Sequence, residues 1–293
     1  MSNENRAMIT SERLWLHSEI IRTGILAVNA EGVATNADKG NKASREIAKK
    51  LAEQLMSETH ERQAGQTSGS NFEVLLSEFL RRTFPKLQHV RPGEWEVMQL
   101  GNRSSLKTSN FAQYEHLGYL QELTKENARL KTIIGNDYMV APDVVVYRYP
   151  MTEKALNAPY DVVDYDTARL TEIRRVNNDK PLLLASVSAK WTMRSDRAQN
   201  SRTEALNLIR NRKGQTPHIV VVTGEPLPSR IASLALGTGD IDCMYHFALY
   251  ELIKAVNDYS NGQGREDIAE QLHTLVEGKR LKDISDLPLD LCL

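Results

Sequence analysis

The chain of 293 residues is 41% hydrophobic and 26% charged, which excludes intrinsic disorder and is long enough to bury a substantial core. Its formal net charge of −1 excludes a uniformly basic surface, so any surface that binds nucleic acid must be a local patch. Two distant cysteines are too few for a disulfide framework, and no apolar run is long enough to span a membrane. The N-terminus is polar and shows no signal peptide, so we expect a cytoplasmic protein.

The first third of the chain has the amphipathic spacing of helices. Apolar residues from Ile47 to Leu55 recur on one face, and Ser44 before them is expected to cap that helix. A second helix should begin near Asn71 and stop at Pro85, because proline cannot donate a helix hydrogen bond. The elements expected next are short strands at 88–90 and 94–99 and a long helix over 112–133.

The centre of the chain changes to apolar, β-branched runs that are typical of central strands, at 138–149 and 182–190. The later elements are a helix at 198–212, a strand at 218–223, a short helix from Ser229 to Gly237, a strand near 241–245 and helices at 246–258 and 266–276. Because strands alternate with helices, the pattern predicts an α/β fold whose central sheet is covered by helices on both faces. No internal repeat or linker interrupts the sequence, so we expect one domain over residues 1–293.

A carboxylate and an amine lie on the two central strands in a pattern that suits metal-dependent hydrolysis. Asp143 follows Pro142 inside one strand, and Ser188-Ala189-Lys190 ends the next. Because side chains alternate along a strand, Ser188 and Lys190 share a face, and Asp143 can meet Lys190 across the sheet. One carboxylate and one amine placed in this way suit the binding of Mg²⁺ and the positioning of an attacking water. The alternative is a Pro-Asp turn and a surface lysine.

Two glutamates are candidates for the further acid that such a site requires. Mg²⁺ prefers hard oxygen ligands, usually from more than one carboxylate. Glu204 lies 14 residues beyond Lys190 on the following helix, from which its side chain can return to the strand ends. Glu73 lies beside the apolar face of its own helix. The alternative for both glutamates is an ordinary charge on the solvated side of a helix.

The most distinctive local pattern is Arg194-Ser195-Asp196-Arg197, directly after the second central strand. The segment from Lys190 to Lys213 holds seven basic and two acidic residues in a chain that is otherwise close to neutral, which suits contact with phosphates. Each arginine can bind O6 and N7 of a guanine, and the aspartate can accept from cytosine N4, so the cluster suits adjacent G·C pairs. The alternative is an ordinary surface cluster of salt bridges.

Together these features resemble the CCGG-recognising type II restriction endonucleases, a family of the PD-(D/E)xK nuclease class. The stretches that carry the resemblance are GQTSGSNFE (65–73), APDVVV (141–146), SVSAKWTMRSDRAQNSRTEALNLIRNRKG (186–214), PHIVVVTGEP (217–226), PSRIASLALGTGDIDCMYHFALYE (228–251) and GKRLKDISDLPLDL (278–291). The resemblance implies a restriction-endonuclease-like mixed sheet and Mg²⁺-dependent hydrolysis of double-stranded DNA. The alternatives are a DNA-binding protein that does not cut and a repair nuclease of the same fold.

The resemblance also assigns the catalytic residues. Asp143, Lys190 and Glu204 form the catalytic set, in which Lys190 helps to orient and deprotonate the attacking water. Ser188 stands where the standard form of the site has a glutamate, and Glu73 is an accessory acid. The expected metal ligands, for about two Mg²⁺ ions in each active site, are Asp143, Glu204 and Ala189.

The remaining assignments concern DNA and assembly. The residues that match DNA contacts are Arg194, Asp196 and Arg197 for the central CCGG, Asp38 and Arg230 for the outer pair of GCCGGC, and Gln66 for the minor groove. Cleavage after the first G, which leaves 5′ overhangs, is implied as well. A palindromic site requires a two-fold dimer, and the resemblance implies that two dimers form a tetramer. A companion DNA methyltransferase is expected in the cell, but not in a stable complex.

Overall fold

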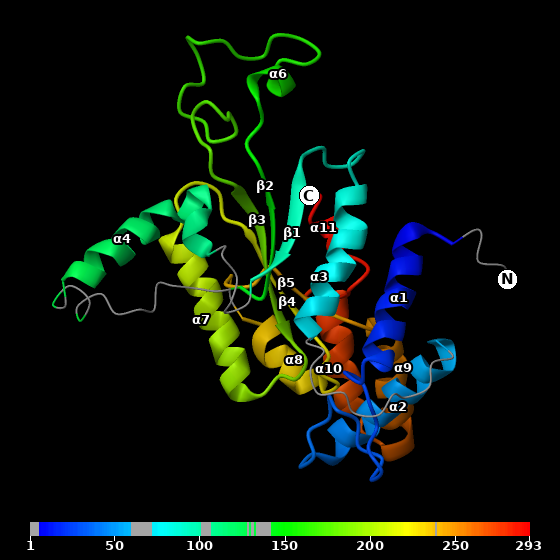
Figure 1. Cartoon of the computed structure of the whole chain (residues 1–293). Helices are drawn as coiled ribbons and strands as arrows, with labels where there is room; N and C mark the ends of the chain where they lie inside the picture. The colour runs from blue at the N-terminus through cyan, green and yellow to red at the C-terminus, as the bar shows by residue number, and fades with distance from the viewer. Residues whose placement is uncertain are drawn as a thin grey trace.

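The centre of the protein is a six-stranded mixed sheet with the strand order β1-β2-β3-β4-β5-β6 (Figure 1). A computed structural model describes residues 6–59, 72–100, 107–127, 129, 132, 142–237 and 239–293. The strands are β1 (Trp95–Gln99), β2 (Val144–Arg148), β3 (Leu182–Lys190), β4 (His218–Thr223), β5 (Cys243–His246) and β6 (Leu281–Asp283). The pairs β1–β2 and β2–β3 are antiparallel, whereas the pairs from β3 to β6 are parallel. The predicted α/β class with a mixed sheet is confirmed.

Helices lie on both sides of this sheet (Figure 1). On the right in that view are α1 (Met8–Arg22), α2 (Lys42–Thr59), α3 (Phe72–Thr83) and α9 (Leu249–Gln263), and on the left are α4 (Glu115–Glu126) and α7 (Ser195–Asn211). The other helices are α6 (Glu153–Leu156), α8 (Pro228–Ala235), α10 (Glu266–Glu277), α11 (Leu287–Asp290) and the 3-10 helices η2 (Phe84–Lys86), η3 (Thr108–Asn110) and η4 (Ala112–Tyr114). Within the described ranges, no helix is long and apolar enough to cross a membrane.

The central strands β3 and β4 have the bounds that the sequence predicts. Val220, Val221 and Val222 of β4 are all buried, as are Ala185 and Val187 of β3. A strand that is covered on both faces is mostly apolar, because side chains on either face meet a layer of helices. Continuous apolar runs therefore marked these two strands correctly.

Two helices begin differently from the prediction. Helix α2 starts at Lys42, and the side chain of Asn41 accepts the Ser44 N–H at 3.0 Å, so Ser44 is not the cap. The Ser44 hydroxyl instead accepts the Asp38 N–H at 2.9 Å. Helix α8 starts at Pro228, one residue before Ser229. Proline suits this first position, because the N–H that it lacks has no partner in the first helical turn.

Several other predicted elements are shorter or absent. The strand expected at 88–90 is wrong, because these residues form a turn in which the Val90 N–H donates to Leu87 O at 2.9 Å. The helix expected over 112–133 begins as η4 and continues as α4, and most of its expected end lies outside the described residues. Of the strand expected over 138–149, the structure shows β2 (Val144–Arg148), and residues 138–141 lie outside the described residues.

The remaining differences lie at helix starts and in the N-terminal region. Helix α7 begins at Ser195 rather than near Ala198. Helix α9 begins at Leu249 rather than His246, because His246 is the last residue of β5 and pairs with Asp283 of β6. Helix α1 was not predicted as a separate element, although the N-terminal third is helical as expected.

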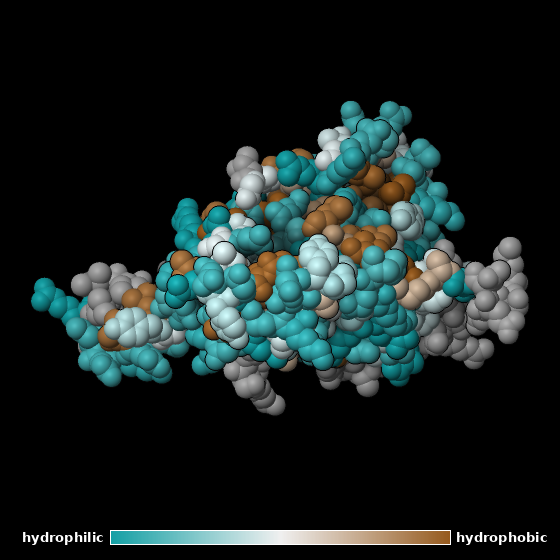
Figure 2. Space-filling model, turned by 90° about the horizontal axis from the view of Figure 1, so that it is seen from above, coloured by the Kyte–Doolittle hydropathy of each residue, from teal (hydrophilic) through white to brown (hydrophobic). Residues whose placement is uncertain are grey.

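An arm of residues 149–181 connects β2 to β3 and projects from the top of the molecule in Figure 1. Its centre is Arg174, only 2% exposed, whose Nε and Nη2 donate to the Glu153 carboxylate at 3.1 and 2.6 Å. Arg174 Nη2 also donates to Asp164 O at 2.7 Å, so one arginine organises most of the arm. Figure 2 looks down on this end of the molecule and shows hydrophobic patches among hydrophilic ones. The large apolar side chains that the arm exposes are Tyr149, Tyr160, Val162, Tyr165, Leu170 and Val176.

Candidate active site

The antiparallel pairing of β2 with β3 brings Asp143 beside the end of β3. The register places Val144 opposite Val187, so Asp143, one residue earlier, lies next to Ser188 and Ala189. One carboxylate oxygen, Asp143 Oδ2, accepts the Ala189 N–H at 2.7 Å and the Lys190 ammonium at 2.9 Å, and it lies 3.4 Å from Ser188 Oγ. The structure therefore brings Asp143 and Lys190 into contact across the sheet.

The chain that follows Lys190 is held in place by Trp191. Its ring packs against Phe72 of α3 and Phe247, with ring centroids 5.1 and 5.0 Å apart. It also lies against Gly224, where an added Cβ would be 2.5 Å from the Trp191 ring. Only glycine allows this close approach, so Gly224 helps to set the path of the chain as it leaves β3.

Helix α7 places Glu204 near Asp143 and Lys190. The Ser201 hydroxyl, also on α7, lies 3.5 Å from the Ser188 hydroxyl on β3, so this part of the helix faces the strand end. Burial raises the pKa of the Glu204 carboxyl above its ordinary value, the positive charge of Lys190 lowers it, and the negative charge of Asp143 raises it. Glu204 lies three residues after Ser201, on the same face of α7, so it is on the side of the helix that faces the strand end with Asp143 and Lys190.

This cluster fits a divalent cation. Burial and the charge of Asp143 both disfavour the ionised form of Glu204, and a bound cation reverses that penalty. Mg²⁺ is commonly held by one or two carboxylates while it keeps several waters, which matches Asp143 and Glu204. Ala189 can contribute only backbone atoms. Among the described residues, no group of three or more His, Cys, Asp and Glu side chains is placed to hold a metal ion.

Glu73 lies on α3 at the same end of the sheet. Its carboxylate accepts a hydrogen bond from the Gln99 side chain at 3.3 Å. Gln99 is the last residue of β1 and pairs with Val144, the residue that follows Asp143. Glu73 is therefore one strand away from Asp143, in a position that suits an accessory rather than a central role.

A second cluster joins the two residues expected to read the outer base pair. The Arg230 side chain forms an ion pair with Asp38, and its Nη1 lies 3.7 Å from Glu225 Oε2. The Gly40 N–H lowers the pKa of the Asp38 carboxyl, and the positive charges of Arg230 and Arg194 lower it further. The backbone before Arg194 also reaches this cluster, because the Met193 N–H donates to Glu225 Oε2 at 2.8 Å, the same atom that lies 3.7 Å from Arg230 Nη1.

The other predicted DNA contacts are less completely described. Arg194 is exposed at the N-cap position of α7. Asp196 and Arg197 lie in the first turn of that helix, but their side chains are outside the described part of the structure. Gln66 is wholly outside the described residues.

The basic segment is less available to DNA than its sequence indicates. Lys190 pairs with Asp143, and Arg202 Nε lies 2.8 Å from Asp240 Oδ2, so these two of its described cations are bound to acids from outside the segment. Neither Asp240 nor Glu225 was predicted from the sequence as a site residue. A signal existed for Glu225, because it follows β4 at the carboxyl ends of the parallel strands, where functional polar groups gather in α/β sheets.

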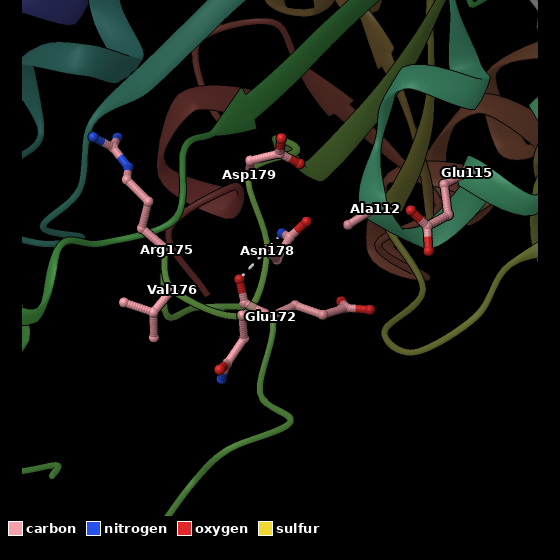
Figure 3. A pocket seen from close by; sticks show the side chains of 8 residues that line it. Ala112, Glu115, Glu172, Arg175, Val176, Asn178 and Asp179 are labelled. Carbon is pink, nitrogen blue, oxygen red and sulfur yellow. Dashed lines mark hydrogen bonds between the residues drawn. The ribbon is translucent and has the colours of Figure 1, made fainter. Parts of the chain in front are cut away.

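A well-formed pocket of about 430 Å³ lies elsewhere, between the arm and the start of α4 (Figure 3). Its charged lining is mostly acidic: it consists of Glu115, Glu172, Asp179 and one basic residue, Arg175. Within it, the Asn178 side chain donates a hydrogen bond to Glu172 O. Asp179 precedes β3, whereas the candidate catalytic lysine ends it. With about 3.3 Å per strand residue, the two are separated by the length of the strand, so this pocket is not the active site.

Comparisons of the sequence with known proteins agree on one family. A family model described as NgoMIV restriction enzyme matches residues 16–293. The type II restriction enzyme NgoMIV of Neisseria gonorrhoeae is 50% identical over 287 residues, which are 98% of this chain and 99% of that protein. Two solved structures, each 14% identical, also match. The first is Bse634I restriction endonuclease, with a TM-score of 0.36, and the match covers 73% of this chain and 86% of that chain. The second is a restriction endonuclease PspGI–substrate DNA complex, with a TM-score of 0.25, and the match covers 91% of this chain and 96% of that chain.

Proposed function

Because the chain belongs to the NgoMIV restriction enzyme family, and is therefore a type II site-specific deoxyribonuclease, we propose that it cuts double-stranded DNA at GCCGGC with Mg²⁺ as cofactor. Cleavage after the first G leaves 5′ overhangs with 5′-phosphate and 3′-hydroxyl ends. The observation that carries the proposed chemistry is the contact of Lys190 with Asp143, 2.9 Å across the sheet, with Glu204 beside them.

Each residue of this cluster has a distinct task in hydrolysis. Asp143 and Glu204 would hold Mg²⁺, which supplies positive charge for the phosphate and the leaving 3′ oxygen. Lys190 carries an ammonium group with three donor hydrogens, one of which goes to Asp143. Its other hydrogens can orient the attacking water and stabilise the negative charge that develops as the water passes its proton to the surrounding solvent. The ion pair with Asp143 favours this role over that of a simple base. Ser188 keeps its hydroxyl close to Asp143.

The second cluster supports the proposed sequence specificity. Arg194, Asp196 and Arg197 would read the central CCGG, and Asp38 and Arg230 the outer pair, with Gln66 in the minor groove. The ion pair between Asp38 and Arg230 supports this assignment, because a guanine and its paired cytosine present the acceptors and the donor that these two side chains need. Arg230 lies in the first turn of α8, so its backbone is held firmly enough for a directional contact.

The cleavage products test the function directly. Purified protein is incubated with plasmid DNA and Mg²⁺, with an EDTA sample as the control, and the new ends are sequenced. We expect every end to map after the first G of GCCGGC and no cutting in EDTA. Cleavage without a unique site indicates a repair nuclease. A gel shift that is independent of Mg²⁺, without any cleavage, indicates a protein that only binds DNA.

Replacing Arg230 by alanine is expected to remove the preference for the outer base pair. A bidentate guanine contact contributes about 1–3 kcal/mol of discrimination, which is about 5- to 150-fold. Cleavage rates of the variant on GCCGGC, ACCGGT and the other NCCGGN sites should then become similar. The control is Arg22→Ala, an exposed arginine on α1. If the Arg230 variant keeps the wild-type order of sites, the residue contacts only phosphate.

The oligomeric state is expected to affect the rate of cleavage. We propose a two-fold dimer that pairs into a tetramer, since a palindromic site requires two-fold symmetry. The exposed apolar side chains of the arm support this proposal, because such patches often mark protein contacts. Light scattering should give about four times the chain mass of 33.1 kDa, and plasmids with two sites should be cut faster than those with one. A uniform dimer with equal rates on both plasmids would contradict the tetramer.

The cellular setting follows from the same proposal. Both cysteines, Cys243 and Cys292, are free thiols, which suits the reducing cytoplasm. A restriction enzyme there also requires protection of the cell's own sites, so we propose a companion DNA methyltransferase that acts separately on the same sequence.

A further inference from the structure

A buried carboxylate lies beneath both groups of proposed base-reading residues. Glu225 follows β4 and has an exposed fraction of 0%. Its Oε2 accepts the Met193 N–H at 2.8 Å, and its Oε1 accepts the Leu227 N–H at 3.2 Å. Oε2 also lies 3.7 Å from Arg230 Nη1, so a single side chain contacts three separate parts of the site.

The two N–H groups belong to the residues that introduce the reading helices. Met193 directly precedes Arg194, the N-cap residue of α7. Leu227 is the N-cap residue of α8, which carries Arg230 in its first turn. The Glu225 carboxylate therefore connects the start of one reading helix to the start of the other, and it also holds the side chain of the outer reader.

The backbone that carries Glu225 is itself well fixed. The Glu225 N–H donates to Thr223 Oγ1 at 3.1 Å, and the buried Asn36 side chain donates to Gly224 O at 2.8 Å. Trp191 packs on Gly224 from the other side. A carboxylate on such a rigid support can transmit an accurate position to the groups that it contacts.

The burial of this charge is not explained by stability alone. Burial raises the pKa of the Glu225 carboxyl, although the Met193 N–H and the charge of Arg230 both favour its ionised form. A buried ion pair often adds little to stability compared with apolar residues of similar volume. Base reading is different, because a bidentate arginine contact depends on the position of the guanidinium to within about 0.5 Å.

We propose that Glu225 is a positioning residue that sets the relative placement of Arg194 and Arg230, and thereby the discrimination against sites that differ in the outer base pair. This inference rests on the proposed function, in which Arg194 reads the inner and Arg230 the outer bases. Glu225 makes no contact with the Asp143–Lys190 pair among the interactions described above, so its effect should appear in specificity more than in the chemical step.

The test is the isosteric change Glu225→Gln, which keeps the size of the side chain and removes its charge. The quantity measured is the ratio of kcat/KM for GCCGGC to that for ACCGGT, in Mg²⁺. We expect the ratio to fall about tenfold, the amount that corresponds to about 1.4 kcal/mol. The matched control is Asp240→Asn, another buried carboxylate paired with an arginine, which should leave the ratio unchanged.

A double-mutant cycle separates positioning from a purely structural effect. In an Arg230→Ala background, Glu225→Gln should change the ratio little, because the outer contact is already lost. If Glu225→Gln does not fold, as judged by circular dichroism, Glu225→Asp replaces it. The aspartate side chain is one methylene shorter, so it keeps the charge but moves the carboxylate away from Met193, Leu227 and Arg230. It should show the same lowered ratio.

The outcomes distinguish this inference from the function on which it rests. A wild type that discriminates between the two sites, with a Glu225→Gln variant that discriminates equally well, overturns the inference and leaves the function intact. A wild type that cuts every CCGG site equally contradicts the outer specificity and the role of Glu225 together. Equal losses in the presence and absence of Arg230 would assign Glu225 a structural role only.

Discussion

Replacing Lys190 by alanine should lower the cleavage rate at GCCGGC by about 10²- to 10³-fold, the range typical for the loss of one fixed donor that stabilises negative charge in the transition state. The Lys190 ammonium lies 2.9 Å from Asp143 Oδ2, at the end of β3 where we propose that the attacking water is held. Specific binding should be largely retained, since the proposed base contacts come from α7, α8 and the loop before α2 rather than from this lysine.

Single-turnover cleavage with enzyme in excess separates these two effects for Lys190→Ala. Binding to cognate and scrambled duplexes is measured in parallel by gel shift. The control is Lys213→Ala, because Lys213 is an exposed lysine of the same basic segment, away from Asp143. Wild-type cleavage by the Lys190 variant would show that the assigned active site is wrong.

Replacing Glu204 by alanine should reduce cleavage by about 10³-fold or more, since a bound metal contributes several kcal/mol and each 1.36 kcal/mol is tenfold in rate. Asp143 would be left as the single carboxylate of the cluster. High Mg²⁺ concentrations should restore little activity, because a ligand of the ion is gone. Thr203→Ala, an exposed neighbour on α7, is the control.

Thermal unfolding gives the Glu204 prediction a second readout. Burial and the charge of Asp143 raise the pKa of the Glu204 carboxyl by more than the charge of Lys190 lowers it, so the ionised side chain is unfavourable in the protein without metal. Glu204→Gln should therefore unfold at the same temperature as the wild type or higher in EDTA. Mg²⁺ should raise the unfolding temperature of the wild type but not of the variant. If Glu204→Ala cuts normally, the metal is held otherwise, and Glu73 is the next residue to replace.

Local sequence patterns were sufficient for the central elements. The bounds of β3 and β4 agree with the prediction, because strands buried on both faces are mostly apolar and so differ from their flanking loops. Helix α10 agrees closely as well, since its amphipathic run stops just before Gly278. Patterns of this kind are set by a residue and its immediate neighbours, so they can be read without knowing the fold.

Helix starts were less predictable, because more than one nearby residue can cap. Ser44 has the side chain of a good N-cap, yet Asn41 takes that role. The Ser44 hydroxyl is committed to the Asp38 N–H, in the turn that presents Asp38 to Arg230. The competition between the two candidates was therefore decided by a contact outside the helix.

For the candidate active site, strand alternation predicted that Asp143 and Lys190 could meet. Spacing and residue chemistry offered Glu204 and the cluster at 194–197, and the resemblance to known endonucleases assigned their roles and added Asp38, Arg230 and Gln66. The sequence by itself thus determined the α/β class, the family and the identity of the candidate site residues. Only the tertiary structure decided that Glu225 lies beneath Arg194 and Arg230, and that Asp38 pairs with Arg230. These partners come from the loop before α2, the end of β3 and the end of β4. They meet because β3 and β4 pair in parallel, and no local pattern records a contact between residues so far apart in the chain.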